Sequence, residues 1–256
     1  MKNSYPFISM FKAEHFKTKR NIAVLSFLLF PFIATMSICA YIAIKASALI
    51  VFETNPWTDL LGNSLLIMYL FYPFLVTILV YSLCDMEYKN GNFKRLFTLP
   101  YPMHTLFASK ILFLFEIIFI STLIAYASFL LSGSILNHFF PALSFHDYDI
   151  RLSCFIAHTR LFISLLAVSF IQYWLSLIFK NFVIPIGFGG FMTLFSLFTM
   201  NKEHSYLNPF VSVIHSMDEF VTYQSISFSN HNYLCLAYII VFLFINFFTF
   251  KLQKNR

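Results

Sequence analysis

The sequence predicts an all-α membrane protein with six transmembrane helices, an N-terminal amphipathic interfacial helix and a short cytoplasmic helix between spans two and three. The chain of 256 residues is 59% hydrophobic and 11% charged, with a mean hydropathy of +0.75, whereas soluble domains are about 25% charged. Its apolar residues gather in runs of about 20, the length that a helix needs to cross a bilayer. Residues 1–256 are therefore interpreted as one membrane domain.

The apolar runs define the six spans. They cover residues 22–44, 60–83, 110–132, 160–179, 182–200 and 233–250. A short FKNF connection predicts that the fourth and fifth spans form an antiparallel hairpin. The run that begins at Ile22 is too long for the apolar part of a signal peptide, and no small-residue cleavage site follows it. We therefore expect the first span to be retained.

The basic residues orient the spans. With the N-terminus inside, four of the 17 Lys and Arg residues lie outside, and these are Lys45, Arg151, Arg160 and Lys202. The others lie on the inner side, and cytoplasmic loops of membrane proteins carry such an excess. Both termini are thus predicted to be cytoplasmic, and residues 133–159 and 201–232 to be extracellular loops. The same bias accounts for the net charge of +6, which indicates no nucleic-acid partner.

Histidines and cysteines are the candidate metal ligands. Six histidines fall in the outer segments, namely His138, His146, His158, His204, His215 and His231. Their spacing is irregular, which favours exposed loop histidines over a zinc site. The cysteines Cys39, Cys84, Cys154 and Cys235 form no C-x-x-C motif, so neither a metal site nor a disulfide framework is indicated. A Cys154–Cys235 bond near the outer surface stays open as an alternative.

One acidic residue, Glu116, lies well inside a predicted span. It is about 9 Å from the start of span three at 1.5 Å per residue, and intramembrane acids are costly and frequently functional. It is either a substrate-path or proton-carrying carboxylate or, as we favour, an acid that bonds to a neighbouring helix or faces an inner vestibule. The sequence contains no P-loop, G-x-S-x-G or H-E-x-x-H motif that would indicate an enzyme.

Residues 1–21 predict the interfacial helix. Its apolar face carries Phe7, Met10 and Phe11, and its charged positions are Glu14, His15, Lys17, Lys19 and Arg20. Aromatic and basic residues alternating in this way are typical of a helix that lies in the bilayer interface. The alternative is a disordered basic tail that only enforces topology.

Residues 84–109 form the longest inner loop. Asn90-Gly91 predicts a turn, and Asn92 is a suitable cap for a helix from Phe93 to Leu99. Pro100 and Pro102 would end that helix.

The predicted helix has one apolar face. Leu96 and Leu99 lie on it, with Lys94 and Arg95 alongside. Together with Phe93 and Phe97, these leucines make the segment too apolar for a loop that contacts only water. A protein partner is favoured over an ordinary basic loop.

A run of residues in this loop carries a family pattern. The run consists of Glu87, Gly91, Leu96, Thr98, Leu99 and Pro100, followed by Ser109-Lys110. It resembles the loop after span two in the permease subunits of type-2 ABC transporters, where the segment forms a coupling helix that docks on an ATPase subunit. The resemblance implies an ATPase-coupling role for Glu87, Gly91, Phe93, Lys94, Leu96, Leu99 and Pro100. Pro102-Met103-His104 departs from the Arg or Ser that members often carry there, which affects the exit of the coupling helix.

Two further segments extend the resemblance. FKAEHFKTKRN, in which Glu14 precedes Lys17 by three residues, is similar to the N-terminal connecting helix of the family, and this assigns Phe7, Phe11, Glu14 and Lys17 to the interfacial helix. LNPF at 207–210 and KNFVIPIGFGG at 180–190 resemble the lantibiotic-immunity branch.

The resemblance implies a permease subunit of an ATP-driven exporter in a bacterial cell membrane. It would act as a homodimer or with a sister permease, and ATP and Mg would bind to a separate ATPase subunit, with no cofactor on this chain. The implied cargo is an amphipathic antimicrobial peptide or a lipid-like compound.

Two other classes of protein stay open. A non-transporting receptor or accessory immunity protein would bind a peptide through the outer loops and need no ATPase. A membrane enzyme built on Glu116 and the outer histidines is disfavoured, because no nucleophile or metal set converges on them.

Overall fold

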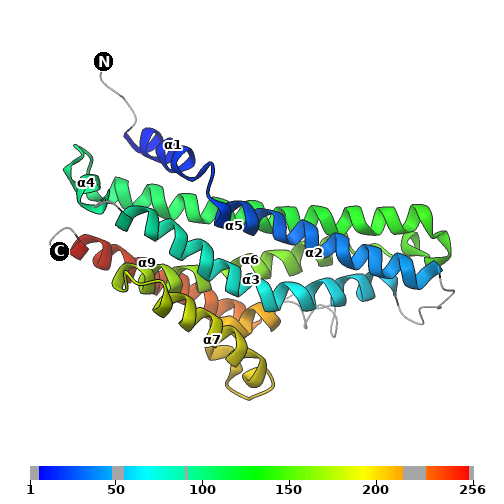
Figure 1. Cartoon of the computed structure of the whole chain (residues 1–256). Helices are drawn as coiled ribbons and strands as arrows, with labels where there is room; N and C mark the ends of the chain where they lie inside the picture. Colours follow the sequence, from blue (N-terminus) through cyan, green and yellow to red (C-terminus); the bar gives the residue numbers. More distant parts are fainter. Residues whose placement is uncertain (1–5, 48–54, 90–91, 216–228, 254–256) are drawn as a thin grey trace.

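The structure of the chain, a computed structural model, describes residues 6–47, 55–89, 92–215 and 229–253 (Figure 1). Five long apolar helices form a bundle, and these are α2 (Ile22–Ser47), α3 (Pro56–Tyr88), α5 (Met103–Phe139), α6 (Arg151–Ile178) and α9 (Asn230–Leu252). The shorter helices are α1 (Pro6–Thr18), α4 (Asn92–Thr98) and α7 (Val183–Thr199), and residues 209–215 are also helical. Single 3-10 turns are η2 (Pro141–Leu143), η3 (Phe145–Asp147) and η4 (Ser205–Leu207). The described ranges contain no strand.

The all-helical membrane fold is confirmed, with one difference in the spans. The predicted fifth span is α7, which has 17 residues and is about 26 Å long at 1.5 Å per residue. That is shorter than a bilayer core of about 30 Å. Figure 1 shows that α7 starts at the same end of the molecule as α4, and that α9 returns to this end.

The helices on both sides of the predicted loops are longer than expected. α3 has 33 residues and α5 has 37, so α5 begins seven residues before the predicted span and continues to Phe139. Only residues 140–150 connect α5 to α6, so helices occupy most of the predicted outer loop 133–159. Hydropathy missed these helix ends because their polar residues, such as Thr105 and Ser109, are buried against neighbouring helices.

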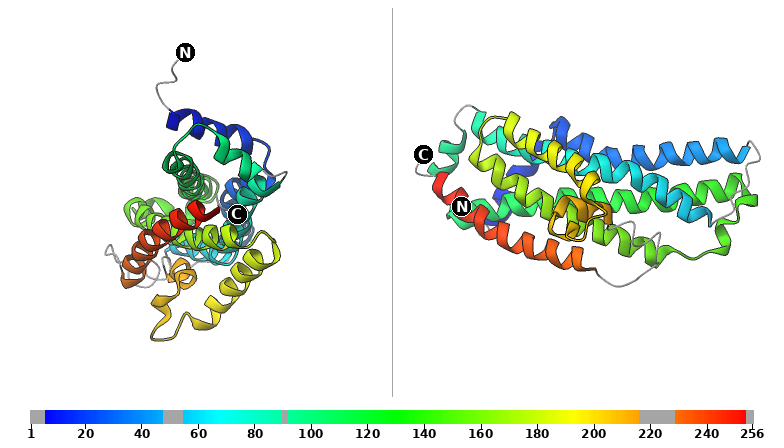
Figure 2. Two further views of the ribbon diagram at one scale, coloured as in Figure 1. Left: turned by 90° about the vertical axis from the view of Figure 1, so that its left-hand side faces the viewer. Right: turned by 90° about the horizontal axis from the view of Figure 1, so that it is seen from below.

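α6 lies at the centre of the bundle. It packs against α3, α5, α7 and α9, while α2 packs against α3 and α5, and the two views in Figure 2 place α1 and α7 on opposite sides of the molecule. Ser164, Ser169 and Ser176 on α6 are fully buried. Small side chains at helix contacts let backbones approach closely, which is how helices associate in lipid.

Burial on α6 and α9 corrects the prediction for His158 and decides the open Cys154–Cys235 alternative. His158 is buried and its Nδ1 lies 2.8 Å from the Cys154 carbonyl oxygen, so it is not a loop histidine. Arg160 is buried on the same helix. Cys154 and Cys235 are buried free thiols, so they form no disulfide.

Three of the predicted loop histidines, His138, His146 and His204, are exposed. The rings of His215 and His231 stack with centroids 4.3 Å apart and are half-buried. Within the described residues, no group of three or more His, Cys, Asp or Glu side chains is placed to hold a metal ion.

Gly189 lies where α7 packs closely against α3 and α6, which yields a stability prediction. A Cβ on Gly189 would lie 2.2 Å from Thr77 Oγ1 and 2.6 Å from Gln172 Nε2. Gly189→Ala should therefore cost about 1–3 kcal/mol through overpacking, measured by thermal unfolding in detergent. Gly187→Ala is the matched control, because nothing lies within 4 Å of its Cβ position and alanine favours the helix by about 0.5–1 kcal/mol. Equal effects of the two variants would contradict the close approach.

Candidate functional site

α4 is held against the bundle by a group of aromatic rings. We call Tyr88, Phe93, Phe97, Phe107 and Phe250 the aromatic anchor. Phe93 is buried and stacks on Tyr88 with centroids 5.3 Å apart. Both Phe93 and Phe97 lie 5.6 Å from the ring of Phe250 near the end of α9, and Phe107 of α5 lies 5.7 Å from it. The anchor thus joins α4 to α3, α5 and α9.

The anchor changes which side of α4 is available to a partner. The prediction counted Phe93 and Phe97 as apolar surface, but both pack towards the bundle, and Leu96 is half-buried. Between Phe93 and Pro100, the exposed residues with described side chains are Arg95, Thr98, Leu99 and Pro100, and Leu99 is 41% exposed. α4 also begins at Asn92 itself and ends at Thr98. Gly91 and the side chain of Lys94 lie outside the described residues.

Four charged side chains, three of them buried, form a group beneath α4. We call Glu14, Lys17, Glu87 and Lys110 the charge cluster. Lys110 Nζ lies 2.7 Å from Glu14 Oε1 and 2.7 Å from Glu87 Oε1. Lys17 Nζ lies 2.7 Å from Glu14 Oε2 and also pairs with Glu87. The cluster therefore connects α1 to the end of α3 and the beginning of α5.

The cluster balances two carboxylates against two ammonium groups. The side chains of Glu14, Glu87 and Lys110 are 8% exposed or less, whereas Lys17 is 32% exposed. Ionised groups that leave water are strongly disfavoured unless they are paired, so each of the three buried members depends on the others. Removal of one partner from a buried pair is more costly than replacement of the whole pair.

Polar contacts fix the surrounding helix ends. Asn21 Oδ1 accepts from the backbone N–H of Ala23 at 2.8 Å, and Asn21 Nδ2 donates to Ser82 Oγ at 2.9 Å, which ties the α1–α2 corner to α3. Tyr88 donates to the carbonyl oxygens of Ser176 and Leu177 at the end of α6. These hydrogen bonds tie the α1–α2 corner and the end of α6 to α3.

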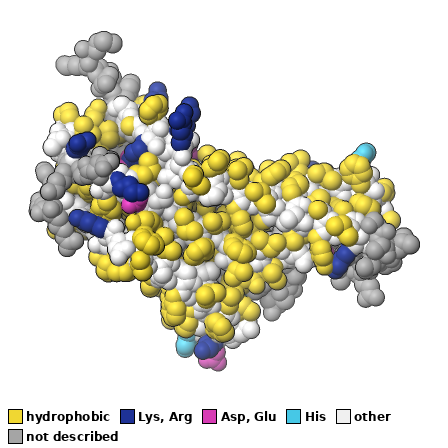
Figure 3. Space-filling view, in the orientation of Figure 1, with side chains coloured by type: hydrophobic (Ala, Val, Ile, Leu, Met, Phe, Trp, Pro, Cys, Tyr) yellow, Lys and Arg dark blue, Asp and Glu magenta, His cyan; other side chains and the backbone are white. Residues whose placement is uncertain are grey.

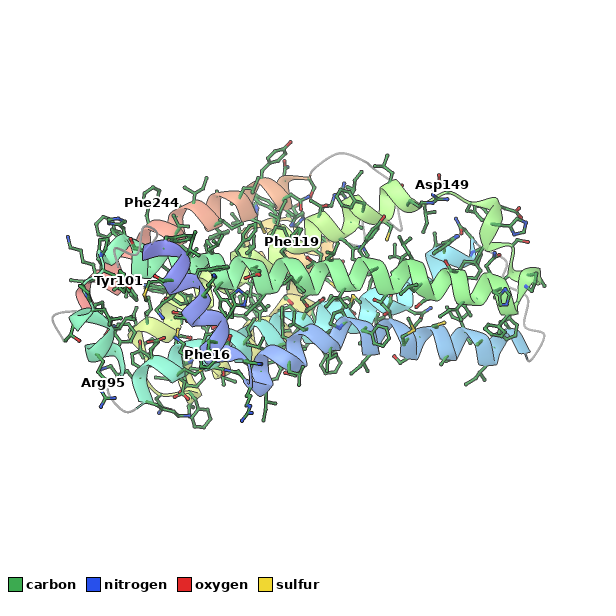
Figure 4. The ribbon with its side chains drawn as sticks, turned by 90° about the horizontal axis from the view of Figure 1, so that it is seen from above. Phe16, Arg95, Tyr101, Phe119, Asp149 and Phe244 are labelled. Carbon is green, nitrogen blue, oxygen red and sulfur yellow. The ribbon has the colours of Figure 1, made fainter. Side chains whose placement is uncertain are left out.

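α1 packs across α5, as Figure 4 shows from above. Its buried side chains are Met10, Glu14 and Thr18, and Phe7 and Phe11 are half-buried. The apolar side chains that point away from the bundle are instead Ile8 and Phe16, and Phe16 is 83% exposed. The interfacial position of α1 remains a prediction, with Ile8 and Phe16 as its outward apolar residues.

Glu116 is paired with α1. His15 Nε2 lies 2.8 Å from Glu116 Oε2, and the Glu116 side chain is 32% exposed. The ring of His15 also packs edge-on against Phe11 and Phe113, at 4.9 and 5.0 Å. This placement agrees with the interpretation of Glu116 as an acid bonded to a neighbouring helix.

The structure adds residues that the sequence interpretation had not assigned to a site. Lys110 was expected only as the first residue of span three, but α5 begins at Met103, so Lys110 lies two turns inside a helix. A cation at that depth requires a partner, and this signal was readable once the helix start was known. Tyr88 and Phe250 gave no signal, because aromatic residues are frequent throughout the chain, with 36 Phe.

The space at the cluster is too small to bind a nucleotide or a cargo. A cavity of about 20 Å³ lies between the cluster and Cys84, Phe113 and Tyr173. That volume is close to the minimum for one water molecule. The site is thus a closely packed contact between helix ends. Its exposed part is the outer edge of α4, formed by Arg95, Leu99 and Pro100.

Long apolar helices that cross a bilayer, with a short helix fixed at one end of the bundle, define a multi-pass membrane protein. Comparison with known protein families matches residues 10–196 to the ABC-2 family transporter protein, which is more than half of the chain. The chain belongs to this family and is a membrane permease component of an ABC-2 type transporter. No curated protein and no solved structure matches the chain.

Membership settles two expectations. The ABC-2 permease domain lacks ATPase activity, so the prediction that this chain is not an enzyme is confirmed. Permeases of this family typically pair with an ATPase subunit.

Proposed function

We propose that this chain is the permease subunit of an ATP-driven exporter, and that the exposed edge of α4 receives the motion of the ATPase subunit. The observation that carries the proposal is the way α4 is held. The aromatic anchor joins α4 to the ends of α3 and α9, and the charge cluster joins the end of α3 to α1 and α5. A contact on Arg95 and Leu99 would move these helices together, because packed interiors transmit displacement with little compression.

Glu87 takes a different role in this proposal from the one that the family pattern suggests at first sight. Its carboxylate is buried and paired with Lys110 and Lys17, so it does not offer a surface to the ATPase. It positions α4 by fixing the end of α3. The docking residues are Arg95, Leu99 and Pro100, which are exposed.

The proposed topology has six passes and cytoplasmic termini. α1, α4 and the end of α9 lie at one end of the molecule (Figure 1), which requires an even number of passes, and α7 supplies the sixth. The excess of Lys and Arg in the segments at this end supports its assignment to the cytoplasm. The protein would act in a bacterial cell membrane as a homodimer or with a sister permease.

The proposed cargo is an amphipathic antimicrobial peptide or a lipid-like compound, exported in an immunity or resistance function. This step is supported only by the LNPF and KNFVIPIGFGG segments. It is an analogy with the lantibiotic-immunity branch, and a shared fold does not fix the cargo.

The docking proposal is tested by capture of the candidate ATPase subunit on the purified, detergent-solubilised chain. Leu99→Asp and Arg95→Glu should each weaken capture by about tenfold or more, because a charge would enter the apolar contact or oppose the partner's charge. Arg151→Glu, at the other end of the molecule and 81% exposed, should leave capture unchanged.

Two outcomes would overturn the docking proposal. Capture that is unchanged in both α4 variants would place the ATPase contact elsewhere. A wild-type chain that captures no ATPase would favour the receptor or accessory immunity protein. Identical elution profiles of all variants establish that they are folded.

A further inference from the structure

A second site lies far from α4, where α7 diverges from the bundle. α7 packs on α3 and α6, and Figure 1 shows it leaning away from α9. The space between them is an open cleft of about 400 Å³. Tyr238 of α9 and Leu207 of η4 both line the cleft, and the Tyr238 hydroxyl donates to the Leu207 carbonyl oxygen at 2.9 Å.

The walls of the cleft are apolar. They are formed by Phe188, Met192 and Phe195 of α7, Ile171 of α6, Phe242 of α9 and Phe210. The volume is within the range of about 300–1,000 Å³ that ligand sites occupy. Figure 3 shows that the side chains around the α7 region are mostly hydrophobic, so a ligand would reach the cleft from the bilayer.

One end of the cleft is polar and carries hydrogen-bond donors. Lys202, His204 and Asn208 line it, and Figure 3 shows charged atoms at the end of the segment after α7. Asn208 Oδ1 accepts from the N–H of Phe210 at 3.0 Å, whereas the buried Asn208 Nδ2 has no hydrogen-bond partner among the described residues. No salt bridge involves Lys202 within the described ranges. Glu203 follows Lys202 but does not line the cleft.

We propose that this cleft binds one anionic phospholipid of the surrounding membrane. An acyl chain lies between Phe188, Met192 and Phe242, and the phosphate accepts hydrogen bonds from Lys202 and Asn208 Nδ2. The ammonium supplies the charge that an anionic headgroup complements, and the amide supplies a donor that is otherwise buried without a partner, which is a costly state. The bound lipid fills the space between α7 and α9.

The experiment titrates the purified full-length chain in detergent with phosphatidylglycerol or phosphatidylcholine of identical acyl chains. Bound lipids are counted by native mass spectrometry. We expect one phosphatidylglycerol to bind in preference to phosphatidylcholine, and glycerol phosphate, which lacks acyl chains, not to displace it. Lys202→Glu should weaken phosphatidylglycerol binding by about tenfold, and Met192→Trp should abolish it by filling the cleft.

Two matched variants control for charge and bulk. Lys45→Glu reverses a charge at the end of α2, which does not line the cleft. Phe191→Trp enlarges a side chain of α7 that is 62% exposed and does not line the cleft. Both should bind as the wild type does. Equal binding of the two lipids, displacement by glycerol phosphate, or wild-type binding by both Lys202→Glu and Met192→Trp would each overturn the proposal. The ATPase capture described above is independent of this result, so the two proposals fail separately.

Discussion

Lys110→Met is expected to lower the unfolding free energy by about 3–5 kcal/mol, the largest stability loss that we predict for this chain. Lys110 Nζ is the shared partner of Glu14 and Glu87, which are both buried. Without it, two carboxylates face each other in a packed interior, and Lys17 alone, which is partly exposed, remains to balance them. The measurement is thermal unfolding in detergent, with the melting temperature of the variant compared with that of the wild type.

A surface pair on the same side of the molecule provides the control for Lys110→Met. Lys89 pairs with Asp85 one turn away, and its side chain is 71% exposed. Exposed pairs contribute at most about 1 kcal/mol, so Lys89→Met should change the melting temperature little. If Lys110→Met and Lys89→Met had equal effects, the charge cluster would not be a buried unit.

A combined variant separates the loss of a partner from the loss of charge. Glu14→Gln, Glu87→Gln and Lys110→Met together leave no buried ion, so they should be less destabilising than Lys110→Met alone. If the triple variant lost more unfolding free energy than Lys110→Met, the charge cluster would stabilise the fold by more than the neutralisation of its own buried charges.

Phe93→Ala is expected to cost about 3 kcal/mol, near the lower end of the range for buried phenylalanine, because a seven-residue helix can partly settle into the space. The truncation removes the ring that contacts Tyr88, Phe97 and Phe250. Under the proposed function, the variant still captures the ATPase through Arg95 and Leu99, but stimulation of ATP hydrolysis by the permease falls because α4 is no longer rigidly held. Unfolding and ATPase assays measure the two effects.

Two further substitutions at α4 serve as comparisons for the stability loss in Phe93→Ala. Phe93→Leu keeps most of the volume and should lose only the ring contacts, about 1 kcal/mol. Leu99→Ala alters a side chain that is 41% exposed and should hardly change stability. A stability loss in Leu99→Ala as large as in Phe93→Ala would mean that α4 is held by its outer edge instead of by the aromatic anchor.

The class of fold, the five long helices and the short helix after span two were predictable, because each depends on the composition of one contiguous stretch. A run of about 20 apolar residues forms a membrane helix whatever lies beside it. The turn residues near Asn90 and the prolines after Leu99 act on the backbone next to them. Membership in the permease family was also readable from the loop around Glu87 and Leu99.

The limits of helices and the partners of side chains were not predictable in this way. α5 starts at Met103 because its polar first turns are buried against neighbouring helices, a circumstance that hydropathy does not register. The pairing of Lys110 with Glu14 joins residues 96 positions apart. Asp85 and the other inner-side Lys and Arg residues offered equally plausible pairings until the fold brought these together.

Local chemistry thus determined that this chain enters the membrane as a bundle of helices with a short helix between two of them. The tertiary structure decided which face of that short helix packs against the bundle. Phe93 and Phe97 point inward because the end of α9 places Phe250 beside them, which leaves Arg95 and Leu99 outside. Periodicity reveals that a helix has an apolar face, but only the position of a neighbour, set by contacts distant in sequence, determines whether that face meets the core or a partner.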